Sequence, residues 1–186
     1  MDERMIPPPS RADRMFCSWR IALFILGISG IVWLGATNIR TLIGSDLLEP
    51  GTTRLLEYIA PDAEREIYRL ISMTAIVTMI SYLVVLVSGA VFLARSPWKF
   101  KENGWLVMSA ILLYVFVPVE LFCISLDAQM VYLEFFTAEG NTAFRELVLA
   151  RIGALSGAPF VALFCYYTIV ALAVFQPLKR APARKS

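Results

Sequence analysis

The sequence predicts an all-α integral membrane protein built as a four-transmembrane-helix bundle. Two observations support this prediction: the composition is too apolar for a soluble domain, and the chain contains four long runs almost free of charge. Of its 186 residues, 58% are hydrophobic and 17% are charged, and the mean hydropathy is +0.67. Soluble domains average about 45–50% apolar and about 25% charged residues. A chain of this composition cannot cover its surface with polar groups, so part of its solvent must be lipid.

Each charge-free run is long enough to cross the hydrocarbon core of a bilayer, which takes roughly 20 apolar residues in a helix. Because a helix satisfies its own backbone hydrogen bonds, it is the expected form of each run in lipid. The predicted spans are residues 21–39, 70–94, 104–126 and 152–178. We expect a transmembrane domain over 19–178, with a disordered cytoplasmic tail over 1–18 and a basic cytoplasmic tail over 179–186.

The positive charges are distributed unequally over the predicted connections, and this predicts the orientation. Eleven of the 17 lysines and arginines lie in the two tails and the middle connection, and six lie in or beside the other two connections. Since segments rich in lysine and arginine stay in the cytoplasm, both termini are expected there. Neither outer connection has an Asn-x-Ser/Thr acceptor for glycosylation, which favours the plasma membrane of a bacterium, its inner membrane, for this multi-pass protein.

The two outer connections are expected to contain short helical segments. In the first, a threonine cap within residues 51–53 could open a helix that places Leu55, Leu56 and Ile59 on one face. Such an amphipathic helix suits the membrane surface or a partner protein. In the second, residues 131–136 have the spacing of a helix that continues out of the membrane.

A weak internal repeat relates the two halves of the chain. Arg65-Glu66 opens a stretch that ends at Pro97-x-Lys99, and Arg145-Glu146 opens a stretch that ends at Pro177-x-Lys179 with the same spacing. A duplication would give two tandem helical hairpins related by a pseudo-two-fold axis along the membrane normal. Two apolar helices always resemble each other to some extent, so a chance likeness stays open.

Glu120 is an acidic residue inside the third predicted span. It follows Gly104 by 16 residues, or about 24 Å along a helix, and Asp127 lies two turns further on the same face. Arg151 and Arg145 approach the same end of the bundle and could reach these carboxylates. An ionised acid near mid-membrane costs about 2.5–3.5 kcal/mol and usually faces a bundle interior or a wet cavity. These four residues form the candidate intramembrane polar site.

Two interpretations of that site stay open. In the functional one, Glu120 responds to protons or cations in a polar cavity. In the structural one, Glu120 is an acid near the interface that is either paired with Arg151 or protonated.

Pro118 and Pro159 are expected to kink the third and fourth spans at a similar depth, because each proline frees a carbonyl four residues earlier. The start of the fourth span carries a GxxxG pattern flanked by alanines at helical spacing. Small residues let helix backbones approach closely, so we expect a helix-packing face, within the chain or between chains, formed by Gly153, Gly157, Ala150, Ala154 and Ala158.

Several function classes lack the residues that they need. The chain has no histidine, which excludes haem ligation by histidine, His-containing zinc and iron sites, and Ser-His or Cys-His catalytic pairs. Its three cysteines are too few and too scattered for a disulfide framework or an iron–sulfur cluster. We expect no catalytic residue, no cofactor, no metal and no nucleic-acid partner.

The leading expectation is a non-catalytic polytopic inner-membrane subunit: an accessory, assembly or scaffold component of a larger membrane complex. Its partners would be the lipid bilayer and other membrane subunits or further copies of itself. The alternative is a small oligomeric transporter or channel with a proton- or cation-responsive site at Glu120. An enzyme acting on lipid comes third, because Glu120 and Asp127 lie about 10 Å apart along the helix axis and are poorly placed to share one reacting atom.

Overall fold

The computed structural model describes residues 11–49, 52, 56, 59–137, 141–153 and 157–178. Four segments in this part of the chain are helical, long and apolar enough to cross a membrane: Ser18–Ser45, Pro61–Arg95, Gly104–Phe136 and Ala158–Phe175. The predicted all-helical architecture with four candidate spans is confirmed. In chain order the helices are α1 (Arg11–Ser45), α2 (Pro61–Arg95), α3 (Gly104–Tyr114), α4 (Val117–Phe136), α5 (Asn141–Ile152) and α6 (Ala158–Phe175).

The first two helices are longer than the predicted spans 21–39 and 70–94. Each has 35 residues, or about 52 Å at 1.5 Å per residue, whereas the hydrocarbon core is about 30 Å thick. Helix α1 begins at Arg11, inside the stretch 1–18 that the sequence assigns to the tail, so part of that stretch is helical. At its other end α1 continues to Ser45, which places Arg40 within the helix.

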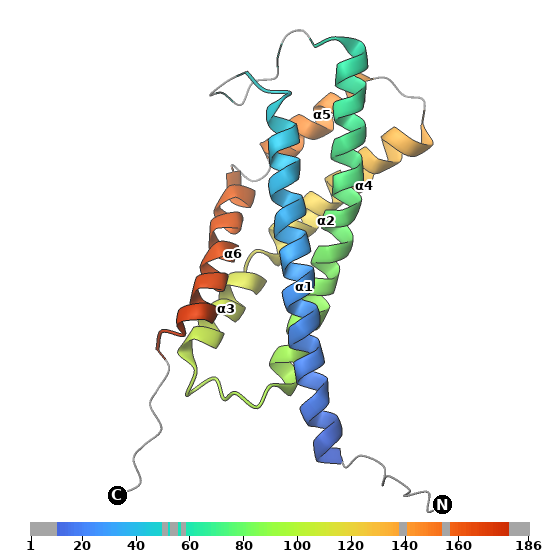
Figure 1. Ribbon diagram of the computed structural model, residues 1–186. Coiled ribbons are helices and arrows are strands. Elements are labelled where there is room, and N and C mark those ends of the chain that lie inside the picture. The colour runs from blue at the N-terminus through green and yellow to red at the C-terminus, as the bar shows by residue number, and fades with distance from the viewer. Residues whose placement is uncertain are drawn as a thin grey trace, which may run out of the picture.

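Helices α1 and α2 pack side by side along much of their length (Figure 1), and their buried positions recur every seven residues. This interval separates the buried residues Trp33 and Arg40 of α1, and it also separates Arg40 from the buried Leu47, which lies just beyond the end of the helix. A seven-residue period is typical of left-handed helix pairs, and small side chains allow close approach within membranes. The same interval on α2 relates the buried residues Tyr68, Ala75, Tyr82 and Gly89.

The third span is divided into two helices. Helix α3 ends at Tyr114 and helix α4 starts at Val117, with Pro118 as its second residue. Proline has no backbone N–H, and its ring collides with the carbonyl four residues earlier, which here belongs to Tyr114. The predicted kink is therefore a short break between α3 and α4. Helix α4 then passes the predicted end at residue 126 and continues to Phe136, as expected for the second connection.

The prediction of a continuous helix over 152–178 is wrong at its start. Helix α5 stops at Ile152, and helix α6 begins after Gly157. Gly157 has a φ of +88°, a left-handed conformation that glycine adopts without a steric penalty. Pro159 is the second residue of α6, where its missing N–H and fixed φ suit the first turn of a helix. Gly157 and Pro159 thus form the start of α6.

The predicted GxxxG packing face is a consequence of that wrong helix and does not form. Ala150 lies on α5 and Ala158 on α6, while Gly153 and Gly157 lie at the two sides of the break. Ala154 lies outside the described residues. Because these small residues do not share one helix, they cannot form a common face for another helix.

Replacing Gly157 with alanine is expected to lower the free energy of unfolding by about 1–2 kcal/mol, which is the cost of left-handed backbone for a residue with a Cβ. Thermal unfolding of the purified protein in detergent measures this loss. The matched control is Gly30→Ala, because Gly30 is within α1 and has open space around the position of the added Cβ. Alanine there should be neutral or stabilising. An unchanged unfolding temperature for G157A would contradict the role assigned to this conformation.

The amphipathic helix predicted between α1 and α2 does not form at the residues described there. Leu56 and Ile59 are not helical, and Leu55 lies outside the described residues. The backbone N–H of Leu56 donates to the carbonyl of Leu47 at 2.9 Å, and Ile59 packs against the core cluster that contains Leu47 and Tyr68. Ile59 is therefore held by the protein's own core and does not face a membrane surface or a partner.

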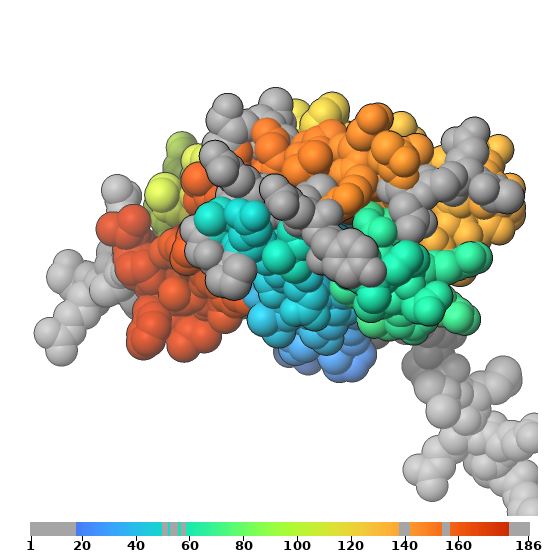
Figure 2. Space-filling view, turned by 90° about the horizontal axis from the view of Figure 1, so that it is seen from above, coloured from blue at the N-terminus to red at the C-terminus, as the bar shows by residue number. Residues whose placement is uncertain are grey.

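Helix α5 lies beside α1 and α2 near one end of the bundle. Figure 2 looks down on that end and shows α5 along one side of α1 and α2, with α6 and α2 on opposite sides of α1. Helix α4 packs against α2 and α5, and helix α3 packs against α6. At the opposite end α1 and α3 begin and α2 and α6 finish (Figure 1). We call the first of these the α5 end and the second the terminal end.

The helix boundaries follow the register of the internal repeat. Helix α2 begins at residue 61 and ends at residue 95, whereas α5 begins at residue 141 and α6 ends at residue 175. The separation in sequence between the two starts, and between the two ends, equals the separation between Arg65 and Arg145. The first copy is one helix, whereas in the second copy α5 ends at Ile152 and α6 begins at Ala158.

Candidate functional site

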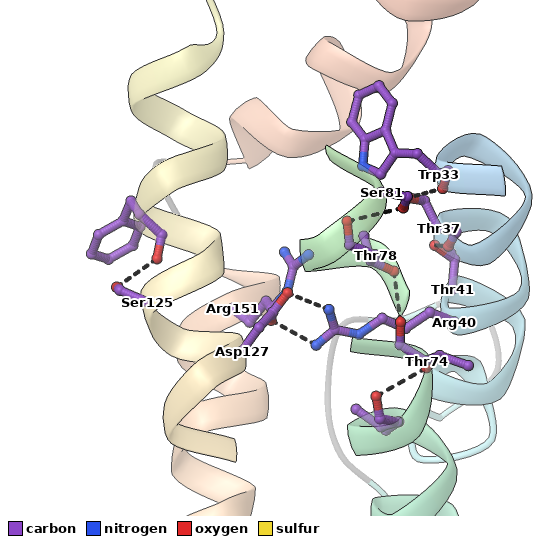
Figure 3. A network of polar contacts seen from close by, with 12 residues as sticks. Trp33, Thr37, Arg40, Thr41, Thr74, Thr78, Ser81, Ser125, Asp127 and Arg151 are labelled. Atoms are coloured by element: carbon purple, nitrogen blue, oxygen red, sulfur yellow. Dashed lines mark hydrogen bonds and ion pairs between the residues drawn. The ribbon is translucent and has the colours of Figure 1, made fainter. Parts of the chain in front are cut away.

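Asp127 forms the centre of a buried ion cluster with two arginines (Figure 3). Asp127 lies on α4 and only 1% of its surface is exposed. The guanidinium of Arg40, on α1, donates from Nη1 to Oδ2 at 2.5 Å and from Nη2 to Oδ1 at 2.7 Å, which is a bidentate contact. Arg151, on α5, places its Nε 2.6 Å from Oδ1. We call Arg40, Asp127 and Arg151 the arginine cluster.

The arginine cluster carries more positive than negative charge. Two guanidiniums share one carboxylate, and arginine keeps its proton in proteins. Burial alone would lower the pKa of the Arg151 guanidinium, but the charge of Asp127 raises this pKa above its ordinary value. Buried charges persist only when they are paired. Asp127 is therefore the residue that allows both arginines to stay inside.

Arg40 is absent from the site that the sequence predicts, because the sequence places it at the boundary of the first span. The helix pair brings it inward: Arg40 lies seven residues after Trp33 on the buried face of α1, and α1 packs against α2 with this period. The regular spacing of Trp33, Arg40 and Leu47 is the sequence feature that could have identified it.

Glu120 lies on α4 two turns before Asp127 but has a different partner. The hydroxyl of Tyr166, on α6, donates to Glu120 Oε1 at 3.3 Å. The ring of Tyr166 lies 4.6 Å from the ring of Trp33, which also packs against Tyr82 at 4.9 Å. These three aromatic residues, which we call the aromatic group, join α1, α2 and α6. Of the two predicted acids, one therefore belongs to the arginine cluster and the other contacts the aromatic group.

A cavity of about 370 Å³ lies beside these two groups and is lined by residues of both. Its walls come mainly from α1, α5 and α6, with further residues from α2, α4 and the connection after α1. Volumes of roughly 300–1,000 Å³ are typical of sites for small molecules. The polar side chains that line the cavity include Arg40, Arg151, Glu120, Thr37, Thr78 and Tyr166.

Arg145 is not part of the arginine cluster. Its Nε lies 3.5 Å from Glu64 Oε1, and its Nη2 donates to the carbonyl of Leu56 at 2.5 Å. These contacts connect α5 to the start of α2 and to the segment before it. Arg145 therefore holds the α5 end together and does not meet Asp127 or Glu120.

The chemistry available at this site is ion pairing and hydrogen bonding. Within the parts of the chain that the structure describes, no three acidic, histidine or cysteine side chains are grouped so that they could hold a metal ion. Cys123 and Cys165 are free thiols. What the structure provides is a largely apolar cavity that is bordered by the guanidiniums of Arg40 and Arg151 and by the carboxyl group of Glu120, which is hydrogen-bonded to Tyr166.

Comparison with known proteins identifies the family. Residues 60–177 match DUF2269, described as a predicted integral membrane protein. The match extends from the residue before α2 to the end of α6 and contains Glu120, Asp127 and Arg151, while Arg40 precedes it. No curated protein and no solved structure matches the chain. The match covers more than half of the chain, and the protein therefore belongs to DUF2269, a family of predicted integral membrane proteins.

Proposed function

We propose that the protein is a carrier for a small solute, which binds in the cavity beside the arginine cluster. The observation that supports this proposal is a cavity of about 370 Å³ lined by Arg40, Arg151 and Glu120 among four apolar spans. Ionisable side chains within a membrane are costly and commonly mark pathways for ions or substrates. A purely structural ion cluster needs no cavity beside it. The proposed role is binding and passage of a solute, without catalysis.

Two helix breaks beside the cavity support the carrier role. The first separates α3 from α4 shortly before Glu120, and the second separates α5 from α6 between Arg151 and Pro159. In many carriers the substrate site is formed by discontinuous membrane helices, and the segments between them can act as hinges. Movement at the break between α3 and α4 would change access to the cavity while the paired α1 and α2 remain in place.

Glu120 is the group that we assign to proton coupling. Its carboxyl lines the cavity and accepts a hydrogen bond from Tyr166 at 3.3 Å, and among the described residues it takes part in no salt bridge. A carboxyl without a paired cation can gain or lose a proton without breaking a salt bridge. The two arginines in the same cavity repel cations, so a proton suits this site better than a metal cation.

The second candidate function, a non-catalytic subunit of a larger membrane complex, is favoured by one feature of α4. Ser125, Ala128 and Gln129 lie on its exposed face, near the outer end of a candidate membrane span. A carboxamide in contact with lipid is costly, and small or polar residues commonly mark contacts between membrane helices. Another chain or another copy is therefore expected to cover this face. Mass spectrometry after purification in mild detergent distinguishes a stoichiometric foreign subunit from a homo-oligomer.

We place the protein in the inner membrane of a bacterium, with both termini in the cytoplasm. Helix α1 begins and helix α6 finishes at the same end of the bundle (Figure 1), as a chain with four crossings requires. Eleven of the 17 lysines and arginines are in the tails and the middle connection, and positive charge of this kind marks the cytoplasmic side.

Labelling of an introduced cysteine tests the carrier role without knowledge of the solute. Cys17, Cys123 and Cys165 are first replaced with alanine, and Thr37, which lines the cavity, is then changed to cysteine. A membrane-impermeant thiol reagent should reach T37C in both inside-out and right-side-out vesicles, because a carrier exposes its site alternately to the two sides. Mass spectrometry measures the labelled fraction.

The matched control is Val84→Cys, because Val84 lies on α2 with 38% of its surface exposed and would be covered by lipid. It should resist the reagent in both kinds of vesicle. Labelling of T37C from one side alone would identify a static pocket and would contradict the carrier role. Absence of labelling from both sides would show that water does not enter the cavity, with the same consequence.

A further inference from the structure

The arginine cluster can accept one more negative charge. Arg40 uses both of its Nη groups on the two carboxylate oxygens of Asp127. Arg151 approaches the same carboxylate through Nε at 2.6 Å. Two guanidiniums against one carboxylate leave an excess of one positive charge within the cluster.

Arg151 is the charge of the cluster that is most accessible from the cavity. Its side chain is 19% exposed, compared with 9% for Arg40 and 2% for Asp127. A guanidinium offers five N–H donors in one plane, and pairs that it forms with carboxylate or phosphate are strong in a site of low dielectric constant. An anionic group that enters the cavity would meet Arg151 first.

Other parts of the cavity wall are apolar, and the cavity reaches the surface between α1 and α6. Ile71, Phe160 and Leu163 line it together with the polar residues. Phe160 of α6 is 49% exposed, and Thr41 of α1, which also lines the cavity, is exposed as well. Since α6 is an apolar span, this edge of the cavity would face lipid. The cavity thus combines a cationic group with apolar walls and an edge open toward the bilayer.

We infer that the cavity binds an amphiphile with a single anionic oxygen group, with that group at Arg151 and its apolar chain along Leu163 and Phe160. This inference rests on the proposed carrier function and names the class of its solute. With the Glu120 carboxyl protonated, a monoanion would balance the charge of the cavity, because two guanidiniums, Asp127 and the bound group then sum to zero. A carboxylate amphiphile and the phosphate head group of an anionic lipid share this chemistry.

Quenching of Trp33 fluorescence by a brominated fatty acid tests the inference directly. Trp33 lines the cavity, whereas Trp19, Trp98 and Trp105 form a separate cluster near the terminal end. Bromodecanoate added to the purified protein in a neutral detergent is expected to quench the emission saturably. The saturable part should disappear in Trp33→Phe, which identifies the reporting residue.

Two ligands and two variants separate charge recognition from apolar partitioning. Bromodecanol has the same chain without the charge and should give no saturable quenching. Arg151→Met should weaken the binding of bromodecanoate about tenfold or more, the usual cost of losing one charged partner in a buried site, while Asp127 keeps its pair with Arg40. Leu163→Trp, on a background with phenylalanine at positions 19, 98 and 105, should block binding by filling the cavity without changing its charge.

Equal binding of bromodecanol, or unchanged affinity in R151M, would overturn the inference. Nanodiscs distinguish the two sources of the anion: competition by phosphatidylglycerol, absent with phosphatidylcholine, identifies a lipid head group, and binding without competition identifies a free acid. If T37C is labelled from both membrane sides but the protein has no affinity for bromodecanoate, the anionic amphiphile is refuted as the solute and the carrier function is retained. If bromodecanoate binds saturably but T37C is labelled from one side only, the carrier function is refuted and the binding site for an anionic amphiphile is retained.

Discussion

Replacing Asp127 with asparagine is expected to lower the free energy of unfolding by about 3–5 kcal/mol, the cost of leaving a buried charge without its partner. Asparagine keeps the volume of the side chain but removes the charge that both Arg40 and Arg151 contact. For a chain of this length such a loss corresponds to a decrease of about 10 °C in the midpoint of thermal unfolding. The midpoint is measured on the purified protein in detergent.

Glu120→Gln is the matched control for this substitution. Glu120 is on the same helix, two turns away, and its partner is the hydroxyl of Tyr166 at 3.3 Å. The change removes a charge without leaving a cation unpaired, so the effect on stability should be about 1 kcal/mol or less. If D127N unfolded at the temperature of the wild type, the assignment of Asp127 as the residue that retains both arginines would be wrong.

A triple variant separates the structural role of the arginine cluster from ligand binding. Replacing Arg40 and Arg151 with methionine and Asp127 with leucine removes all three charges together. Buried ion pairs replaced by apolar residues of similar volume are often neutral or stabilising, so this variant should regain most of the stability that D127N loses. It should not bind bromodecanoate, because no guanidinium remains in the cavity. Retained saturable binding would show that the arginines are not the recognition element.

Trp33→Ala is expected to cost about 3 kcal/mol of stability, because it leaves a large void in the centre of the bundle. Trp33 is 4% exposed and contacts Tyr82 and Tyr166, so it joins α1 to α2 and α6. Phe24→Ala provides the matched control on the same helix: Phe24 is 70% exposed and would face lipid, where truncation leaves no void inside the protein. Thermal unfolding compares the two, and equal effects would contradict the central packing role of Trp33.

The four spans could be predicted because the bilayer imposes a simple requirement of length and polarity on each crossing segment. The break after Tyr114 follows from Pro118 by local sterics alone. Other local features were less informative. The sequence favours a helix around Leu55–Ile59, but packing of Ile59 against the core overrides this preference. Two glycines four residues apart, such as Gly153 and Gly157, can form a packing face within one helix or can lie at the ends of two helices. The spacing of the residues does not distinguish these two structures.

The candidate site was only partly predictable. Asp127 and Arg151 occur at the ends of successive spans, so their approach at one end of the bundle follows from topology, and the structure joins them at 2.6 Å. Arg145 occurs near the same end, but it pairs with Glu64. A charge count places each side chain at an end of the bundle without deciding which partner it faces.

The sequence by itself determined that this protein is a helical membrane protein with four spans. The apolar character and the length of each span are properties of one continuous segment and do not depend on its neighbours in space. Only the tertiary structure decided that Arg40 turns inward to share Asp127, that Glu120 contacts Tyr166 instead, and that a cavity lies beside both. These features depend on the rotation of each helix about its axis and on contacts between residues far apart in the chain, such as Arg40 and Asp127, which are 87 positions apart. Side-chain packing between helices fixes those rotations, and one chain's local pattern does not specify them.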